Sequence, residues 1–335
     1  MSERYKKLVA TSFSTDFREV AEVVEEDRPE PGPQDILVRN KYAAVNATDI
    51  NISAGRYGQV AKPPIDLGVE AAGVVVDVGR EVKHLEVGDS VVTSTLGGGY
   101  REYNLVRASN AVHVPEPSPE VLSIMVSGLT ASIALDEVGQ LGHGETVLVT
   151  AAAGGTGQYA VQLAARGDNH VIGTCGNDEK AAFLESLGCD RPINYREEDV
   201  GAVLADEYPN GLDLVYEGVG GALFDTCVEA LAKGGRLLSI GFVSEYEEGP
   251  QPVEQERIYT KLIPKSASIH GFFLPQFAEH FGAHMKTLMR LQKRGEIDVL
   301  IDDTVFTGVE EVVDAVEYLQ SGESLGKVVV RFPET

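Results

Sequence analysis

The chain of 335 residues contains little cysteine: its three cysteines are Cys175, Cys189 and Cys227. A small and odd number of thiols without paired spacing argues against a disulfide framework. A structural zinc site made of four thiolates would need one cysteine more than the chain has. We therefore expect neither disulfides nor a four-cysteine zinc site.

Basic residues are also scarce. Lys and Arg total 28 against 52 Asp and Glu, which gives a formal net charge of −24 at pH 7. A field of this sign repels phosphate groups, so we expect no binding to nucleic acid or to anionic membranes. Two interpretations of the acidic composition remain open: an ordinary solvated surface, or adaptation to a salty cytoplasm where ions screen the self-repulsion.

Long apolar segments are not evident either. No uninterrupted run approaches the ~20 residues of a membrane helix, and residues 1–20 alternate charged and apolar residues, unlike a secretory signal. With 43% hydrophobic and 24% charged residues, the composition is that of a globular protein. The length is sufficient for two domains with separate cores. We expect a soluble, cytoplasmic protein.

The first third of the sequence is typical of β-structure. Runs rich in β-branched residues, bounded by Gly, Pro or Asn, predict strands at 36–45, 72–79 and 89–94. The proline-rich stretch 114–120 and the helical pattern 124–138 then indicate a domain junction.

From Glu145 onward, strands and helices alternate, which predicts a doubly wound parallel sheet. The expected strands are 146–150, 170–174, 212–216 and 235–241, and the expected helices are 155–166, 178–187 and 220–231. Two further helices, 277–294 and 309–319, and a strand, 327–332, complete the pattern.

A glycine-rich turn lies between the apolar strand 146–150 and the helix that follows. It reads Ala151-Ala-Ala-Gly-Gly-Thr-Gly157, with alanine at the first position of the usual glycine pattern. Backbone N–H groups and a helix N-terminus in such a turn can face a pyrophosphate, and Gly157 is expected where helix and strand pack closely. In this βαβ context the turn predicts dinucleotide binding, although an ordinary tight turn is the simpler alternative.

The end of the second strand favours NADPH over NADH. A site for NADH usually has an acid there that binds the ribose hydroxyls, but the strand ends in Cys175-Gly-Asn177. Asp178 and Glu179 follow at a helix start, where the helix dipole explains them. Lys180 is able to reach a 2′-phosphate, or it is an ordinary solvated charge.

Motifs spread over the chain carry a family resemblance. They are Gly97–Tyr103 (GGGYREY), Gly128–Ala131 (GLTA), Ala151–Gly157 (AAAGGTG), Tyr216–Gly221 (YEGVGG) and Gly271–Leu274 (GFFL). Together they resemble the medium-chain dehydrogenase/reductase superfamily, on its quinone oxidoreductase and enoyl reductase side, and are most similar to the prostaglandin reductase branch. In the superfamily's zinc dehydrogenases, Cys and His ligands occupy the positions of Asn46 and Val69. A valine cannot bind a metal, and the scattered histidines show no compensating cluster, so we expect no catalytic metal.

The resemblance implies an α/β fold in which a Rossmann domain is inserted in a β-rich, GroES-like catalytic domain. The expected boundaries are 1–122 for the catalytic domain, 123–268 for the NADPH-binding domain and 269–335 for the return to the catalytic domain. It also implies a homodimer and an NADPH site. With the phosphate loop included, the expected cofactor-binding residues are Thr130, Gly154, Gly155, Thr156, Gly157, Gly176, Lys180, Tyr195, Ile240, Tyr246, Phe272, Phe273, Leu274 and Ser324.

The activity that this resemblance implies is the NADPH-dependent reduction of the activated C=C bond of enones, without zinc. Such a reaction needs a hydrogen-bond donor for the charge that develops on the substrate oxygen. Tyr57 in Ala54-Gly-Arg-Tyr57 is the expected donor, and Asn46 is expected to position the substrate or the nicotinamide. The alternatives are packing only for Tyr57, quinone reduction as the activity, and an NADPH-binding scaffold with little turnover.

Overall fold

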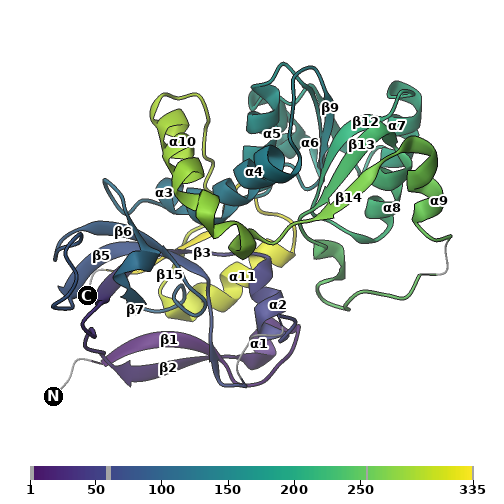
Figure 1. Cartoon of the computed structure of the whole chain (residues 1–335). Coiled ribbons are helices and arrows are strands. Elements are labelled where there is room, and N and C mark those ends of the chain that lie inside the picture. Colours follow the sequence, from purple (N-terminus) through teal and green to yellow (C-terminus); the bar gives the residue numbers. More distant parts are fainter. Residues whose placement is uncertain (1–3, 58–61, 254–255, 334–335) are drawn as a thin grey trace. The chain divides into compact units, whose positions relative to one another are not determined.

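A computed structural model describes residues 4–57, 62–253 and 256–333 of the chain (Figure 1). The chain forms two compact units, Met1–Val126 with Ile301–Thr335, and Ser127–Leu300. The middle of the chain is thus inserted into a unit formed by the two ends. The boundaries expected from the sequence, after residues 122 and 268, lie earlier than those of the compact units.

The first unit is built on mostly antiparallel β-structure. Its larger sheet has the order β15-β16-β3-β5-β6-β8, with β7 also paired to β3, and its smaller sheet has the order β2-β1-β4. The strands are β1 Arg4–Ala10, β2 Ala21–Asp27, β3 Asp35–Ala44, β4 Ile65–Asp66, β5 Glu70–Val78, β6 Ser90–Ser94, β7 Tyr103–Arg107, β8 Ala111–His113, β15 Phe306–Thr307 and β16 Val329–Arg331. The expected strands 36–45, 72–79 and 89–94 are confirmed as β3, β5 and β6.

The core of the larger sheet follows from the two-residue period of its strands. Ile36 and Val38 of β3 both face the core, where they pack with Val75, Val91 and Val106. Short helices complete this unit: α1 Phe17–Val20, α2 Thr48–Ser53, η1 Ala108–Asn110, η7 Val309–Glu311 and α11 Val312–Gln320.

One continuous helical run, Pro119–Val138, contains the boundary between the two units. It consists of α3 Pro119–Ser123, the π-helical η2 Ile124–Gly128, α4 Leu129–Ile133 and the π-helical η3 Ala134–Val138. By length and composition alone it could cross a membrane, although Glu120, Asp136 and Glu137 interrupt its apolar residues. Because 67% of its apolar window is buried inside the protein, the run is explained as a core helix.

The second unit contains a six-stranded sheet in which every pair of neighbouring strands is parallel. The strand order β11-β10-β9-β12-β13-β14 is that of a doubly wound dinucleotide-binding fold, with its topological switch between β9 and β12. The strands are β9 Thr146–Val149, β10 His170–Cys175, β11 Arg191–Asn194, β12 Leu212–Glu217, β13 Leu231–Ser239 and β14 Ser268–Gly271.

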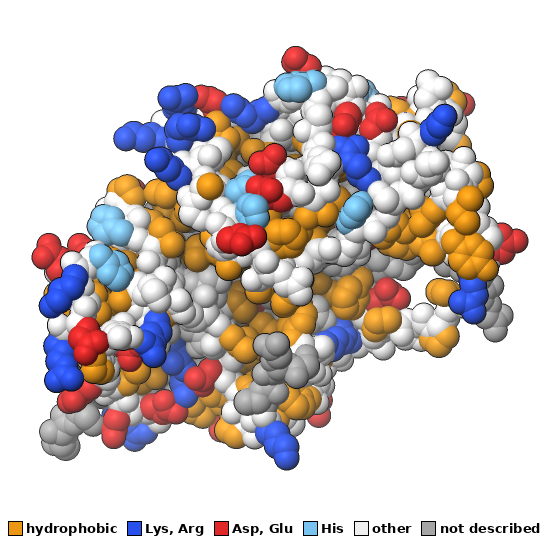
Figure 2. Space-filling model, in the orientation of Figure 1, with side chains coloured by type: hydrophobic (Ala, Val, Ile, Leu, Met, Phe, Trp, Pro, Cys, Tyr) orange, Lys and Arg blue, Asp and Glu red, His pale blue; other side chains and the backbone are white. Residues whose placement is uncertain are grey.

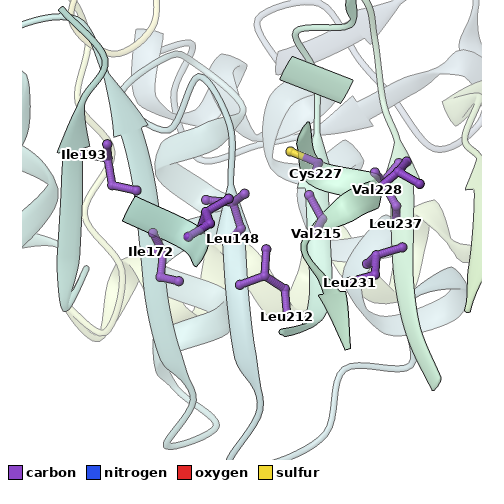
Figure 3. Close-up of a cluster of buried hydrophobic side chains, with 10 residues drawn as sticks. Leu148, Ile172, Ile193, Leu212, Val215, Cys227, Val228, Leu231 and Leu237 are labelled. Carbon is purple, nitrogen blue, oxygen red and sulfur yellow. The ribbon is translucent and has the colours of Figure 1, made fainter. Parts of the chain in front are cut away.

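Helices cover both faces of this sheet (Figure 1). Leu148, Ile172, Val215 and Leu237 come from four strands and pack with Cys227 of α8 in one buried cluster (Figure 3). Apolar side chains on both faces explain why the strands read as continuous apolar runs. The helices of this unit outside the 119–138 run are α5 Gly157–Ala165, α6 Asp178–Ser186, α7 Val200–Glu207, α8 Gly221–Glu229, η4 Val243–Glu245, α9 Tyr259–Leu262, η5 Ile263–Lys265, η6 Leu274–His280 and α10 Phe281–Lys293.

The expected strands and helices between residues 146 and 241 are confirmed, with ends shifted by a few residues. Sequence patterns missed β11, α7 and β14. β11 and β14 are the edge strands, and β11 contains Arg191 and Pro192, which strands tolerate mainly at edges. The helix expected from residue 277 begins at Phe281, because Phe277 has a non-helical backbone within η6.

Candidate active site

A buried polar network surrounds Asn46, which lies between β3 and α2 and is 8% exposed. Asn46 Nδ2 donates to Glu70 Oε1 at 2.9 Å and to the carbonyl oxygen of Ala44 at 3.2 Å. Lys327 Nζ donates to Asn46 Oδ1 at 2.6 Å and lies 3.1 Å from Glu70 Oε1. Asn46, Glu70 and Lys327 therefore hold one another in a closed triangle.

Asp49 and Tyr100 extend this network from the backbone of Asn46. Asp49 Oδ2 accepts hydrogen bonds from the backbone N–H of Asn46 at 2.9 Å and from the Tyr100 hydroxyl at 2.5 Å. Complete burial raises the pKa of Asp49 to about 7, against the opposing effect of these hydrogen bonds. Burial likewise raises the pKa of Glu70, although Lys327 opposes it.

The network contains two buried carboxyl groups and one buried ammonium group. Glu70 Oε2 and Asp49 Oδ1 have no hydrogen-bond partner among the described residues. Glu70 is in direct contact with Lys327, so this pair is charge-balanced, whereas Asp49 has no cation in direct contact within the network. Asp49 is therefore the group that carries a proton as the pH falls toward neutrality.

The hydrogen bonds of Asn46 limit what it can offer a ligand. A side-chain amide has two donor hydrogens and two acceptor lone pairs. Both hydrogens go to Glu70 and Ala44, and one lone pair goes to Lys327. Asn46 can therefore accept one further hydrogen bond, but it cannot donate one to a negatively charged oxygen.

Tyr57 is held against the helix α2 that follows Asn46. Its hydroxyl is 2.6 Å from Thr48 Oγ1, where either oxygen can be the donor, and 3.5 Å from Asn51 Nδ2. When the Thr48 hydroxyl donates to Tyr57, the phenolic hydrogen becomes the donor toward another acceptor. The two expected catalytic residues thus flank the start of one short helix.

The phosphate loop has the backbone geometry that its glycines indicate. Ala151 has φ +47°, and a Cβ on Gly157 would lie 2.5 Å from the carbonyl oxygens of Ala151 and Ala152. These contacts lie within the turn, so the packing of helix against strand expected at Gly157 stays a prediction. Within the described part of the chain, no side chain caps the first turn of α5, so the N–H groups at this helix start suit an anion.

Gly176 and Tyr195, both expected at the cofactor site, meet at the end of β10. A Cβ on Gly176 would lie 2.6 Å from the Tyr195 hydroxyl oxygen, and Tyr195 donates its backbone N–H to Cys175. Asn177 caps α6 by accepting from the backbone N–H of Lys180. Lys180 itself is only 9% exposed, so a fully solvated surface charge does not describe it.

The remaining expected cofactor residues are divided between the two units. Thr130, Ile240, Tyr246, Phe272, Phe273 and Leu274 lie in the second unit with the phosphate loop, and Ser324 lies in the first. The Tyr246 ring packs edge-on against Phe242 with ring centres 4.8 Å apart. Their assignment to the cofactor remains a prediction.

Sequence patterns did not single out three buried charged residues. Glu70 and Lys327 belong to the Asn46 network, and no local motif joins residues so far apart. Glu217 ends β12 beside the switch point, where its Oε1 accepts from the N–H groups of Val219 and Gly220. Burial raises the pKa of Glu217, and its Oε2 has no partner among the described residues. The signal available for Glu217 was an acid inside an otherwise apolar strand.

Comparisons with known proteins agree with this architecture. Residues 32–116 match the model of the alcohol dehydrogenase GroES-like domain, and residues 155–294 match that of zinc-binding dehydrogenases. The chain belongs to the medium-chain dehydrogenase/reductase family, in its branch of quinone oxidoreductases and prostaglandin reductases.

Individual relatives cover nearly the whole chain. Prostaglandin reductase-3 from Mus musculus is 48% identical, over 98% of this chain and 89% of the relative. A probable quinone oxidoreductase from Leishmania amazonensis is 44% identical, over 97% of each chain. The crystal structure of Escherichia coli quinone oxidoreductase complexed with NADPH is similar, with a TM-score of 0.87 and 28% identity over 97% of this chain and 99% of that one.

Proposed function

We propose that this protein is an NADPH-dependent oxidoreductase that reduces the activated C=C bond of α,β-unsaturated ketones without zinc. Oxo-fatty-acid and prostaglandin-like enones are the substrate class. The Asn46 network carries this proposal, together with the similarity to prostaglandin reductase-3. Reduction of a C=C bond does not require a metal that ionises an alcohol, which is the task of zinc in the related dehydrogenases.

The residues at the position of the zinc site do not fit zinc. Asn46 and Val69 stand where the zinc dehydrogenases have ligands, and valine has no donor atom. The Lys327 ammonium already binds Asn46 Oδ1 and Glu70 Oε1, so the donor atoms that remain at this position are engaged in the network.

The phosphate loop fits a dinucleotide. Gly154, Gly155, Thr156 and Gly157 precede or begin α5, whose first turn lacks a side-chain cap in the described structure. Lys180 would hold a 2′-phosphate, since it lies in the first turn of α6 and no acid stands at the tip of β10. Bound NADPH supplies the hydride for this reaction. The aromatic and small residues expected around it would complete the binding surface.

Tyr57 and Asn46 have different roles in this proposal. Asn46 accepts a hydrogen bond from the nicotinamide amide or from a substrate hydroxyl, because its own hydrogens are already used. Tyr57 donates its phenolic hydrogen to the substrate oxygen, supported by a hydrogen bond from Thr48. A donor directed at the oxygen where negative charge develops lowers the barrier more than one that binds the ground state.

The test follows NADPH absorbance with a panel of simple enones, an oxo-fatty enone and a quinone. We expect turnover of the enones, with two hydrogens added to the product by mass spectrometry, and much lower efficiency with NADH. Comparable efficiency with NADH would contradict the assignment of Lys180. If no substrate of the panel is turned over although NADPH binds tightly, the result would favour a scaffold without turnover.

Tyr57→Phe tests the donor. We expect enone turnover to fall about a hundredfold, as for the loss of a general acid. Tyr42→Phe, in β3 of the same unit, is the matched control and should retain wild-type turnover. A Tyr57→Phe rate within about threefold of wild type, roughly 0.65 kcal/mol, would reduce Tyr57 to a packing residue.

Quinone reduction is the second candidate, because the Leishmania amazonensis relative has that name. Turnover of the quinone alone in the same panel would establish it. Both candidates use the same cofactor site, so the panel decides between them without altering the fold or cofactor assignments.

A cytoplasmic homodimer is also part of this proposal. β14 is an edge strand of the parallel sheet, and the segment just before it exposes Tyr259 and Ile263. An open strand edge beside exposed apolar side chains suits pairing with a second copy of the sheet. Light scattering on the purified chain tests the mass, and cell fractionation tests the compartment.

A further inference from the structure

Two histidines and a carboxylate meet at the surface of the second unit, apart from the residues proposed for reduction. His280 ends η6 as the N-cap residue of α10, and His284 lies four residues later in the first turns of α10, so the two side chains share one face. Glu137 comes from η3, and its Oε1 lies 2.9 Å from His280 Nδ1 and 3.3 Å from His284 Nε2. Figure 2 shows histidine side chains lying beside acidic ones on the face in view. The expectation that the histidines form no cluster is wrong at this place, because Glu137 joins them across more than 140 residues.

We propose that Glu137, His280 and His284 form a binding site for a divalent transition-metal ion such as Zn²⁺. Two imidazole nitrogens and one carboxylate are a donor set of zinc sites that keep a fourth position open. Ligand atoms bound to a tetrahedral zinc ion are about 3.3–3.6 Å apart. The three candidate atoms all lie within 4.8 Å of one another, so small side-chain rotations bring them to a common ion.

A neighbouring side chain already orients one of the ligands. Ser132 Oγ is 2.7 Å from His284 Nδ1, and His284 is only 8% exposed. This hydrogen bond leaves Nε2 as the nitrogen that faces Glu137, as in sites where a metal-binding histidine is fixed through its other nitrogen. The fold therefore fixes the orientation of His284 before any ion binds.

The fourth position is open to water or to Asp136. Asp136 Oδ2 lies 3.9 Å from His284 Nε2, and its side chain is mostly exposed. A bound ion would connect α10 to the helical run 119–138 within the second unit. Because the unfolded chain does not hold these residues together, the ion would stabilise the folded state.

Calorimetric titration of the chelator-treated full chain with ZnCl2 tests the site. We expect one saturable event at one ion per chain, a higher melting temperature with Zn²⁺, and a tetrahedral visible spectrum with Co²⁺. His280→Gln, His284→Gln and Glu137→Gln should each weaken binding on the order of a hundredfold, and Ser132→Ala about tenfold. Glutamine keeps hydrogen-bonding capacity, and unchanged melting of these variants in chelator shows that they fold.

His270→Gln is the matched control, because His270 is an exposed histidine of the same unit whose ring bonds Ser268. It should bind zinc as the wild type does. Equal affinity in wild type and in the His280 and His284 variants would overturn the proposal, since the ions would then bind the acidic surface unspecifically. Absence of any saturable binding would overturn it equally.

Discussion

The phosphate loop and the Asn46 network are built in opposite ways. The loop is a continuous stretch, residues 151–157, and its shape depends on backbone packing at Gly157. The network joins Asn46, Glu70 and Lys327 from three distant segments, and it depends on side-chain charges. We therefore expect an added side-chain atom to disrupt the packing of the loop. Removal of a charge should instead destabilise the network.

The largest effect is expected for Lys327→Met, which leaves Glu70 buried without its cation. Breaking a buried ion pair from one side costs about 3–5 kcal/mol of unfolding free energy, measured by chemical denaturation. Lys6→Met is the control, because Lys6 pairs with Glu310 at the exposed surface of the same unit and should have a much smaller effect on stability. Adding Glu70→Gln to Lys327→Met should recover part of the loss. Equal losses of unfolding free energy for Lys327→Met and Lys6→Met would contradict a larger contribution from the buried ion pair than from the surface one.

The second effect is a pH dependence caused by Asp49. Its folded-state pKa of about 7 lies above the ordinary value of 3.8, so ionisation opposes folding. The stability that neutral Asp49 contributes is complete below pH 4 and is lost as the pH rises through 7. Asp49→Asn should remove this loss, so that from pH 4 to 8 the variant gains about 2–4 kcal/mol relative to wild type. Parallel stability curves for the two proteins over this range would refute a raised pKa for Asp49.

The smallest effect is expected for Gly157→Ala. The added Cβ meets two carbonyl oxygens at 2.5 Å, which should cost about 1–3 kcal/mol of stability and weaken NADPH binding about tenfold. Gly282→Ala is the control, since it lies in the first turn of α10 and its added methyl group would meet no described atom within 4 Å outside its own stretch of helix. It should leave NADPH binding unchanged. Fluorescence titration with NADPH compares the two, and similar affinities would show that the loop tolerates a larger side chain.

The sequence predicted the local features well. The glycine loop, the alternation of strands and helices, and the β-rich first third are patterns within a few consecutive residues, and they match β9, α5 and β3. The edge strands β11 and β14 were missed, because a short strand at a sheet edge is held by one neighbour and needs little apolar patterning.

The candidate site was predictable in part for the same reason. Asn46 and Tyr57 stand in a short motif, whereas Lys327 reaches Asn46 only through the pairing of β16 with β3. A single sequence contains no signal for such a register. The burial of Lys180 likewise depends on the packing of α6, which its neighbours in sequence do not reveal.

The π turn at the end of the helical run 119–138 has a consequence for how the chain tolerates changes in length. The backbone N–H of Gly139 bonds to the carbonyl oxygen of Ala134, five residues back, so this turn contains one residue more than a regular α-turn. Each residue advances a helix by about 100°, so removing one residue here would rotate the following side chains by that angle. Deleting Leu135 or Asp136 would then move Glu137 away from both histidines without changing any of the three side chains.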